Sequence, residues 1–194
     1  MLDSFLRPTQ VKTNQDGGLL RLIACVCMFI DHAGKMLFPQ LTWMRMVGRL
    51  AFPLFAYGIA VGAAMTRHPR QYIARVAALA LVSQPLYAVA LGHTNEAMYA
   101  VPFAQHPLRA LCTFYMESWE KPSILLALLL GLLLLLCLRE KQYVPALLIY
   151  VLCARFSAEL DYGVSGIGLM VVFYLFLEHP ALCFAASTAY MLVW

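Results

Sequence analysis

The stretch that decides the fold is LLRLIACVCMFIDHAGKMLF at residues 19–38, followed after a short polar break by MVGRLAFPLFAYGIAVGAAM at residues 46–65. Each run is mostly apolar and about 20 residues long, the length that an α-helix needs to cross a bilayer. Ionisable side chains nevertheless occur in both runs: Asp31 and His32 in the first, and Arg49 in the second. Because such a group costs roughly 2.5–3.5 kcal/mol at the centre of a membrane helix, it usually serves function or faces a polar interior. We therefore expect the chemistry of the protein in this pair of helices.

The composition indicates a membrane protein with an all-α fold. The 194 residues are 62% hydrophobic and 12% charged, whereas a soluble domain carries about 25% charged residues. Uninterrupted apolar runs such as 124–138 lack the alternation of apolar and polar residues that a membrane β-barrel requires. We predict a polytopic transmembrane helical bundle that lies in the lipid bilayer and does not bind nucleic acid.

The chain divides into an N-terminal tail, residues 1–18, and a single transmembrane helical domain, residues 19–194. The tail is polar and lacks the apolar core of a signal peptide, so the first helix is expected to be retained. About seven helices are expected, of which the leucine-rich fourth should face lipid, and the connection at 93–122 should hold a short interfacial helix at 108–116. The expected helices span residues 19–38, 46–65, 71–92, 123–138, 143–156, 163–178 and 180–194.

The distribution of Lys and Arg predicts the orientation in the membrane. More than half of the 14 Lys and Arg residues fall in or beside the tail and the connections near residues 66–75 and 139–142. Since cytoplasmic segments carry an excess of these residues, we predict a cytoplasmic N-terminus, with Asp31 and His32 toward the outer leaflet. The six cysteines include no CxxC pair, and we expect no metal.

His32 is the leading candidate for catalysis. A neutral imidazole takes up a proton near physiological pH. His32 could therefore act as a general base for an amine or hydroxyl, or could itself carry a covalently bound group such as an acyl group. The alternative is a structural histidine hydrogen-bonded between helices. Asp31 is assigned to the same site, but it cannot orient His32 as in a catalytic triad, because adjacent helical residues point about 100° apart. We expect Asp31 to pair with Arg49 instead.

Arginines make up the expected binding site for an anionic substrate or cofactor. Arg49 could hold a phosphate or carboxylate with both arms of its guanidinium, or simply neutralise Asp31. Arg45, one turn earlier, could assist, or could extend its charge into water at the membrane interface. Arg67 and Arg70 belong to the basic loop TRHPRQ. They could receive the phosphates of a nucleotide-like cofactor, or could be ordinary cytoplasmic charges.

Three further residues are assigned to substrate binding. Tyr57 lies in the second apolar run, and Asp161 and Tyr162 precede the expected helix at 163–178. Asp161 and Tyr162 could line the same pocket as His32. For Asp161 the alternative is a cap at the helix N-terminus.

Three blocks of the sequence resemble the TraX family of bacterial membrane proteins, whose founding member acetylates the N-terminal amine of conjugative pilin. The blocks are FIDHAGKMLFP at 29–39, VGRLAFPLFAYGIAVG at 47–62 and DYGVSGIGLMVVFYLF at 161–176. Their order and spacing match the family. The specific parts of the resemblance map onto Asp31, His32, Gly48, Arg49, Phe52, Pro53, Phe55, Asp161, Tyr162, Gly163 and Gly166.

The TraX family is distantly similar to a larger group of integral-membrane acyltransferases, in which a histidine of the first helix is thought to be catalytic and acetyl-CoA is the donor. The resemblance implies acyl transfer from acetyl-CoA with His32 at the centre, in the inner membrane of a bacterium. The acceptor would be the amine of a pilin-like peptide or a cell-envelope glycan, and a homo-oligomer is compatible with the sequence. Two other classes stay open: a proton-coupled carrier of small anions and a non-enzymatic membrane assembly factor.

Overall fold

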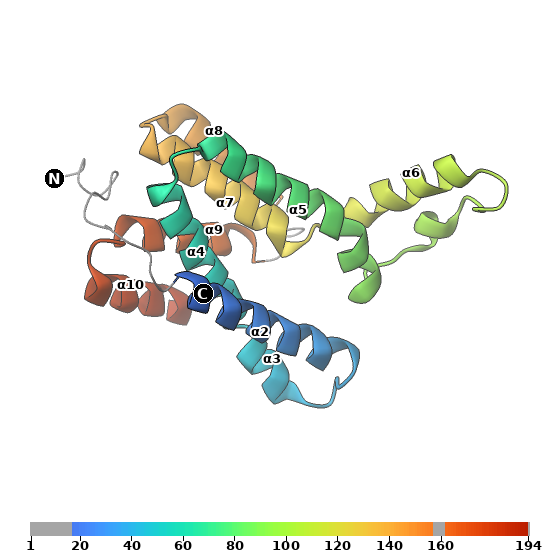
Figure 1. Ribbon diagram of the computed structural model, residues 1–194, viewed down its shortest axis with the longest axis horizontal. Coiled ribbons are helices and arrows are strands. Elements are labelled where there is room, and N and C mark those ends of the chain that lie inside the picture. Colours follow the sequence, from blue (N-terminus) through green and yellow to red (C-terminus); the bar gives the residue numbers. More distant parts are fainter. Residues whose placement is uncertain (1–16, 157–161, 194) are drawn as a thin grey trace.

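The computed structural model describes residues 17–156 and 162–193, and every regular element within these ranges is helical (Figure 1). The predicted all-α fold is therefore confirmed. The α-helices are α2 (Gly17–Met36), α3 (Thr42–Gly48), α4 (Ala51–Met65), α5 (Pro69–Ala90), α6 (Pro107–Glu117), α7 (Ile124–Arg139), α8 (Tyr143–Arg155), α9 (Gly163–Leu175) and α10 (Pro180–Val193). Two short 3-10 helices, η1 (Glu96–Tyr99) and η2 (Ser118–Glu120), flank α6.

Helices α4, α7 and α9 form the core of the bundle. α7 packs against α4, α5, α8 and α9, and its Leu128 and Leu132 are at most 2% exposed. Gly131 lets Met170 of α9 approach closely, because a Cβ atom at position 131 would lie 3.0 Å from Met170 Cε. The prediction that the helix at 123–138 faces lipid is therefore wrong. A helix that is apolar all round also suits a position inside the bundle, and no residue of α7 is exposed.

Three helices of the described chain are long and apolar enough to cross a membrane: α2, the α3–α4 pair counted as one, and α5. α6 and η2 could form a fourth span with α7 only across a bend of 68°. Helices α8, α9 and α10 have 13, 13 and 14 residues. They are about 20 Å long, against a hydrocarbon core of about 30 Å. The seven predicted segments are all helical, but not all have the length of a membrane span.

The outer surface of these helices is apolar, as a lipid environment requires. Phe29 on α2, Val82 on α5 and Phe184 on α10 are each at least 70% exposed. In the most apolar 18-residue segment of each helix, only 22% of α2 and 17% of α5 is buried within the protein. Contiguous apolar surface of this kind is rare on soluble monomers and marks contact with a membrane or a partner.

The second predicted span is broken near its middle. The expected helix at 46–65 is divided into α3 and α4, and Arg49 and Leu50 form a turn between them. Pro53 accounts for the break, because proline has no N–H to donate to the carbonyl four positions earlier, which belongs to Arg49. α3 then packs alongside α2 (Figure 1). Arg49 therefore lies at a turn between two helices.

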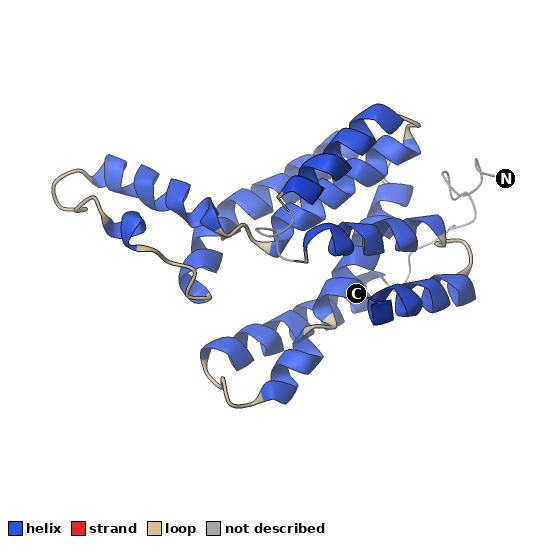
Figure 2. Cartoon of the chain, turned by 180° about the vertical axis from the view of Figure 1, so that it is seen from behind, coloured by secondary structure: helices blue, strands red, loops and turns tan. Residues whose placement is uncertain are grey.

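Residues 93–122 form an arm that projects from the rest of the molecule (Figures 1 and 2). The arm contains η1, α6 and η2, so a helix covers residues 108–116 as predicted. Phe103, Leu108 and Met116 on the arm are 63–79% exposed. The 68° bend between α6–η2 and α7 suits a helix that lies along the membrane surface.

Gln84 of α5 fastens this arm to the bundle. Its side chain is fully buried. Nε2 donates hydrogen bonds to the carbonyl oxygens of Ser118 at 2.6 Å and Lys121 at 3.1 Å, while Oε1 accepts from the backbone N–H of Ser123 at 2.9 Å. One amide thus satisfies three backbone groups where the chain passes from η2 into α7.

The proline inside α5 provides a second attachment point. Pro85 cannot donate to the carbonyl of Leu81, so that carbonyl is left without its helical partner. The hydroxyl of Tyr115 on α6 donates to it at 3.1 Å. The arm therefore supplies the hydrogen-bond donor that the carbonyl of Leu81 lacks because of the proline.

Candidate functional site

His32 lies in the C-terminal half of α2 and is half-buried. Its Nδ1 is 2.7 Å from the carbonyl oxygen of Met28, one turn earlier. A carbonyl can only accept a hydrogen bond, so Nδ1 carries the proton of the neutral imidazole and Nε2 keeps its lone pair. The helix backbone thus fixes the tautomer in which Nε2 can act as a base or nucleophile.

Asp31, the next residue, lies against α3 at Gly48. A Cβ atom at position 48 would lie 2.7 Å from the Cα atom of Asp31, so the two backbones are in direct contact. No ion pair joins Asp31 to Arg49, although both belong to the described part of the chain. The predicted pair is therefore wrong for this structure, because the turn at residues 49–50 leaves the Arg49 side chain exposed.

Arg45 belongs to the same contact between α2 and α3. A Cβ atom at Gly34 would lie 2.8 Å from Cβ of Met44 and 3.8 Å from Cγ of Arg45. The stem of Arg45 therefore runs close to α2, while the side chain as a whole is exposed. This placement suits an arginine whose charge reaches into the aqueous interface.

Lys35 brings a further residue to this end of α2. Its Nζ is 3.4 Å from Nε2 of His93, which follows α5 and lies 58 positions further along the chain. Because an ammonium group only donates, His93 Nε2 accepts this hydrogen bond. Lys35 follows His32 by one helical turn. No pattern in the sequence indicates that Lys35 contacts His93.

The second and third sequence blocks meet through aromatic side chains. The ring of Phe52 on α4 stacks on Tyr162 with centroids 4.0 Å apart and planes at 6°. Gly166 makes room for this pair, because a Cβ atom there would lie 2.8 Å from Cζ of Phe52. Tyr57 is half-buried and packs edge-on against Phe173 at 5.6 Å, beside the core. Asp161 lies outside the described residues.

The three blocks therefore converge on the junction of α3 and α4. Gly48 before the junction contacts Asp31 of the first block, and Phe52 after it contacts Tyr162 of the third. This convergence brings Asp31, the residue before His32, into contact with the junction.

The basic loop lies away from His32. Arg67 and Arg70 are exposed, as are His68 and Arg75. The 15 residues of α4 separate Gly48 from this loop by about 22 Å, at 1.5 Å per residue. The structure therefore does not place Arg67 and Arg70 beside the imidazole.

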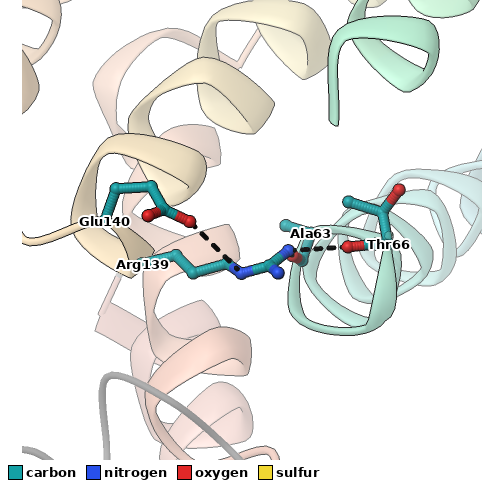
Figure 3. Close-up of polar contacts among 4 residues, drawn as sticks. All are labelled: Ala63, Thr66, Arg139 and Glu140. Carbon is teal, nitrogen blue, oxygen red and sulfur yellow. Dashed lines mark hydrogen bonds and ion pairs between the residues drawn. The ribbon is translucent and has the colours of Figure 1, made fainter. Parts of the chain in front are cut away.

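Arg139 is a polar residue near this loop whose role the sequence did not indicate. Its Nη1 donates hydrogen bonds of 2.9 Å to the carbonyl oxygens of Ala63 and Thr66, and its Nε lies 3.8 Å from Oε1 of Glu140 (Figure 3). The last carbonyls of a helix lack intrahelical partners, and here an arginine of α7 satisfies those of α4. From the sequence, the charge of Arg139 indicated only the orientation of the chain in the membrane.

The chemistry available at His32 is that of a base, because Nε2 of His32 can accept a proton. Lys35 follows one turn later on α2, and Arg45 and Arg49 lie on and directly after α3, the helix that packs against α2. Among residues 17–156 and 162–193, no three His, Cys, Asp or Glu side chains converge as metal ligands would.

Comparison with known proteins places this arrangement in a family. The family model described as "TraX protein" matches residues 16–194. The chain is 26% identical over 165 residues to the probable fimbrial assembly protein FimC, serogroup H1, of Dichelobacter nodosus, over 82% of this chain and 60% of that protein. It is also 35% identical over 66 residues to protein TraX of Escherichia coli K12. This alignment covers 34% of this chain and 26% of that protein.

A third relative, the uncharacterized protein RP591 of Rickettsia prowazekii, is 48% identical over 48 residues, which is 25% of this chain and 19% of that protein. The chain thus spans 60% or less of the length of these relatives. No solved structure matches it. With a family model that matches from the start of α2 to the last residue, and with apolar helices of membrane-spanning length, this chain belongs to the TraX family of membrane proteins.

Proposed function

We propose that this protein is a membrane acyltransferase that moves an acetyl group from acetyl-CoA to an amine or hydroxyl acceptor. The observation that carries the proposal is the contact of His32 Nδ1 with the carbonyl oxygen of Met28. The Nδ1–H of His32 is engaged with this carbonyl at 2.7 Å, so the lone pair of Nε2 is available to take a proton from the acceptor.

The transfer can be written with His32 as general base. The acceptor nitrogen or oxygen attacks the thioester carbonyl carbon while its proton passes to Nε2 of His32. The carbonyl π electrons move onto oxygen and form a tetrahedral intermediate. When the C=O bond re-forms, the C–S bond breaks, and the thiolate takes the proton from the imidazolium. The products are the acetylated acceptor and CoA, and His32 returns to its starting state.

The donor is proposed to enter from the cytoplasmic side of the inner membrane. Under the predicted topology, exposed Arg67 and Arg70 face the cytoplasm, where they can attract the phosphates of CoA. Arg49 and Arg45 lie about 22 Å away, at the far end of α4, and are proposed to bind donor groups closer to the reacting atoms. Tyr162, stacked on Phe52, and Tyr57 are proposed to line the acceptor side.

The acceptor class is suggested by the relatives. One matched relative is named a probable fimbrial assembly protein, and the TraX family resemblance implies acetylation of a pilin N-terminus. We therefore propose the N-terminal amine of a pilin-like peptide as the acceptor to test first, with a cell-envelope glycan hydroxyl second. The name of that relative also favours, as a second function, an assembly factor without catalysis.

The test measures acetyl transfer by the purified protein in detergent. Acetyl-CoA and a peptide with a free N-terminus are supplied, released thiol is followed colorimetrically, and the peptide mass is measured. His32→Gln and His32→Ala should abolish transfer while the protein stays monodisperse. His106→Gln is the matched control, because His106 is exposed on the arm and should leave the rate unchanged.

Two results would contradict the proposal. Near-native transfer by a well-folded His32→Gln protein would remove His32 from the reaction, because an amide cannot take up the proton. Native protein that neither binds nor cleaves acetyl-CoA would favour the assembly factor, or the carrier of small anions if proteoliposomes accumulate such an anion.

A further inference from the structure

We propose that Lys35 and His93 form a second half of the His32 site, in which the Lys35 ammonium stabilises the negative charge that develops on the acyl carbonyl oxygen, and His93 positions that ammonium. The inference rests on the proposed acyl transfer. In this assignment Lys35 is a catalytic residue, because it contacts the reacting oxygen, and His93 is a positioning residue.

The first support is the placement of Lys35 on α2. Residues three apart on a helix are neighbours, with Cβ atoms about 5–6 Å apart, so Lys35 stands one turn from His32 on the adjoining face. Lys35 is half-buried, whereas Arg45 and Arg49 are exposed. Of these three cations, Lys35 is the one best shielded from water, where a charge has its largest effect on a reaction.

The second support is the partner that Lys35 contacts. Asp31 precedes Lys35 by four residues, the spacing at which helical acid–base pairs form. No ion pair joins them, although both are described residues, and the ammonium instead lies 3.4 Å from His93 Nε2. A neutral imidazole orients the ammonium without cancelling its charge. Of its three N–H donors, one contacts His93 and two are left for a ligand.

The third support is the way in which the chain holds His93. Its backbone N–H donates to the carbonyl of Ala88 at 2.8 Å, and its ring lies 5.6 Å from that of Tyr87 at an angle of 32°. Two residues later, Asn95 Oδ1 accepts from the N–H of Met98 at 2.9 Å. A lysine side chain is flexible, so an anchored acceptor at its tip reduces the number of positions that the ammonium occupies.

Asn95 also ties this start of the arm to its far end. Its Nδ2 donates to Oε2 of Glu120 at 2.5 Å and to Oε2 of Glu117 at 3.4 Å. The loop that carries His93 is therefore bound at both ends, to α5 and to the far end of the arm. The His93 ring is therefore held in place where the Lys35 ammonium contacts it.

In the transfer step the role of Lys35 is electrostatic. As the acceptor attacks the thioester carbon, the π electrons of the carbonyl move to its oxygen, and the two remaining N–H groups of Lys35 donate to that oxygen. When the C–S bond breaks, the electrons return and the hydrogen bonds weaken. Lys35 keeps its protons throughout, and the transferred proton travels through His32 alone. Donors preorganised for a developing oxyanion typically contribute about 10²–10³ in rate.

The experiment compares charge removal with charge retention at Lys35. Lys35→Met should lower kcat about 10²-fold or more while KM for acetyl-CoA changes less than about threefold, because the contact forms only in the transition state. Lys35→Arg keeps the charge and should retain more activity than Lys35→Met. Lys121→Met is the matched control, because Lys121 is exposed and outside the site.

A second pair of variants leaves Lys35 in place. His93→Leu removes the acceptor and should lower kcat, whereas His93→Gln supplies a carbonyl oxygen that accepts from the ammonium and should restore most of it. A purely structural contact predicts lower thermal midpoints for these variants with unchanged kcat per folded molecule. That result, or a kcat of Lys35→Met within about threefold of the native value, would overturn the assignment of Lys35 and His93 alone. If the native protein transfers no acetyl group, the proposed function falls and this inference falls with it.

Discussion

A Cβ atom placed on Gly48 would lie 2.6 Å from Oδ1 of Asp31, closer than any real Cβ contact. Gly48→Ala should therefore force α3 away from α2 and lower the free energy of unfolding by about 1–3 kcal/mol, the usual cost of overpacking. Thermal unfolding in detergent measures this. Gly58→Ala is the control, since nothing lies within 4 Å of its Cβ position. Equal stability of the two variants would contradict the close contact.

Gln84→Leu should be strongly destabilising. It removes three hydrogen bonds at a fully buried position, and each backbone group left unpaired costs about 1–3 kcal/mol. Hydrogen exchange should show the loss first between η2 and α7. Ser83→Ala, which removes only a 3.4 Å bond to the carbonyl of Ala80, should have little effect. If Gln84→Leu showed native-like protection at that junction, the Gln84 side chain would not be what holds the arm to α7.

Arg139→Met should loosen the end of α4. Loss of the guanidinium leaves the carbonyls of Ala63 and Thr66 without their donor, and the expected cost is about 1–3 kcal/mol in unfolding free energy. Glu140→Gln removes only a 3.8 Å ion pair, and the Glu140 side chain is exposed. Such a pair should contribute less than about 1 kcal/mol. The two thermal midpoints, compared in one detergent, check the difference, and a larger effect of Glu140→Gln would reverse the interpretation.

Arg49→Lys tests donor binding. Because Arg49 makes no ion pair with Asp31, an ammonium at this position should be tolerated by the fold. If the guanidinium binds a donor phosphate with two hydrogen bonds, losing one should weaken acetyl-CoA binding about tenfold, since a bond to a charged group contributes about 1.5 kcal/mol or more. Titration calorimetry gives the dissociation constant, with Arg155→Lys as control. An unchanged value would remove Arg49 from the donor site.

The predicted orientation places the two ends of α5 on opposite sides of the membrane. Arg70→Cys, in a protein with Cys25 replaced by serine, should not react with an impermeant maleimide added to intact cells. Native Cys112 is exposed on the arm beyond the other end of α5 and should react. Reaction at position 70 with none at Cys112 would invert the topology.

The sequence predicted the helices well because runs of about 20 apolar residues have few alternatives in a bilayer. It did not predict which helix is buried. α7 consists almost entirely of leucine, and such a helix has no polar face to tell lipid from protein. The short lengths of α8 and α9 likewise depend on connections that apolar composition does not reveal.

The candidate site was predicted in part. Asp31 and Gly48 come together because their helices are consecutive and short connections favour contact. The expected Asp31–Arg49 pair failed because Pro53 breaks the helix and moves Arg49 into a turn. The contact of Lys35 with His93 spans 58 positions, and pairing over that distance depends on the path of α5, which no local pattern encodes.

The break between α3 and α4 has a consequence for the lipid around it. Arg49 and Leu50 keep right-handed helical dihedrals, but Pro53 leaves the Arg49 carbonyl without its helical donor, and at membrane depth such a group must be satisfied by protein or water. The exposed Arg49 side chain likewise cannot be packed by hydrocarbon tails. Charged groups in such positions draw in water and thin the bilayer locally. The membrane beside His32 should therefore be thinner than elsewhere, so that an acceptor arriving from water has a shorter way to the imidazole.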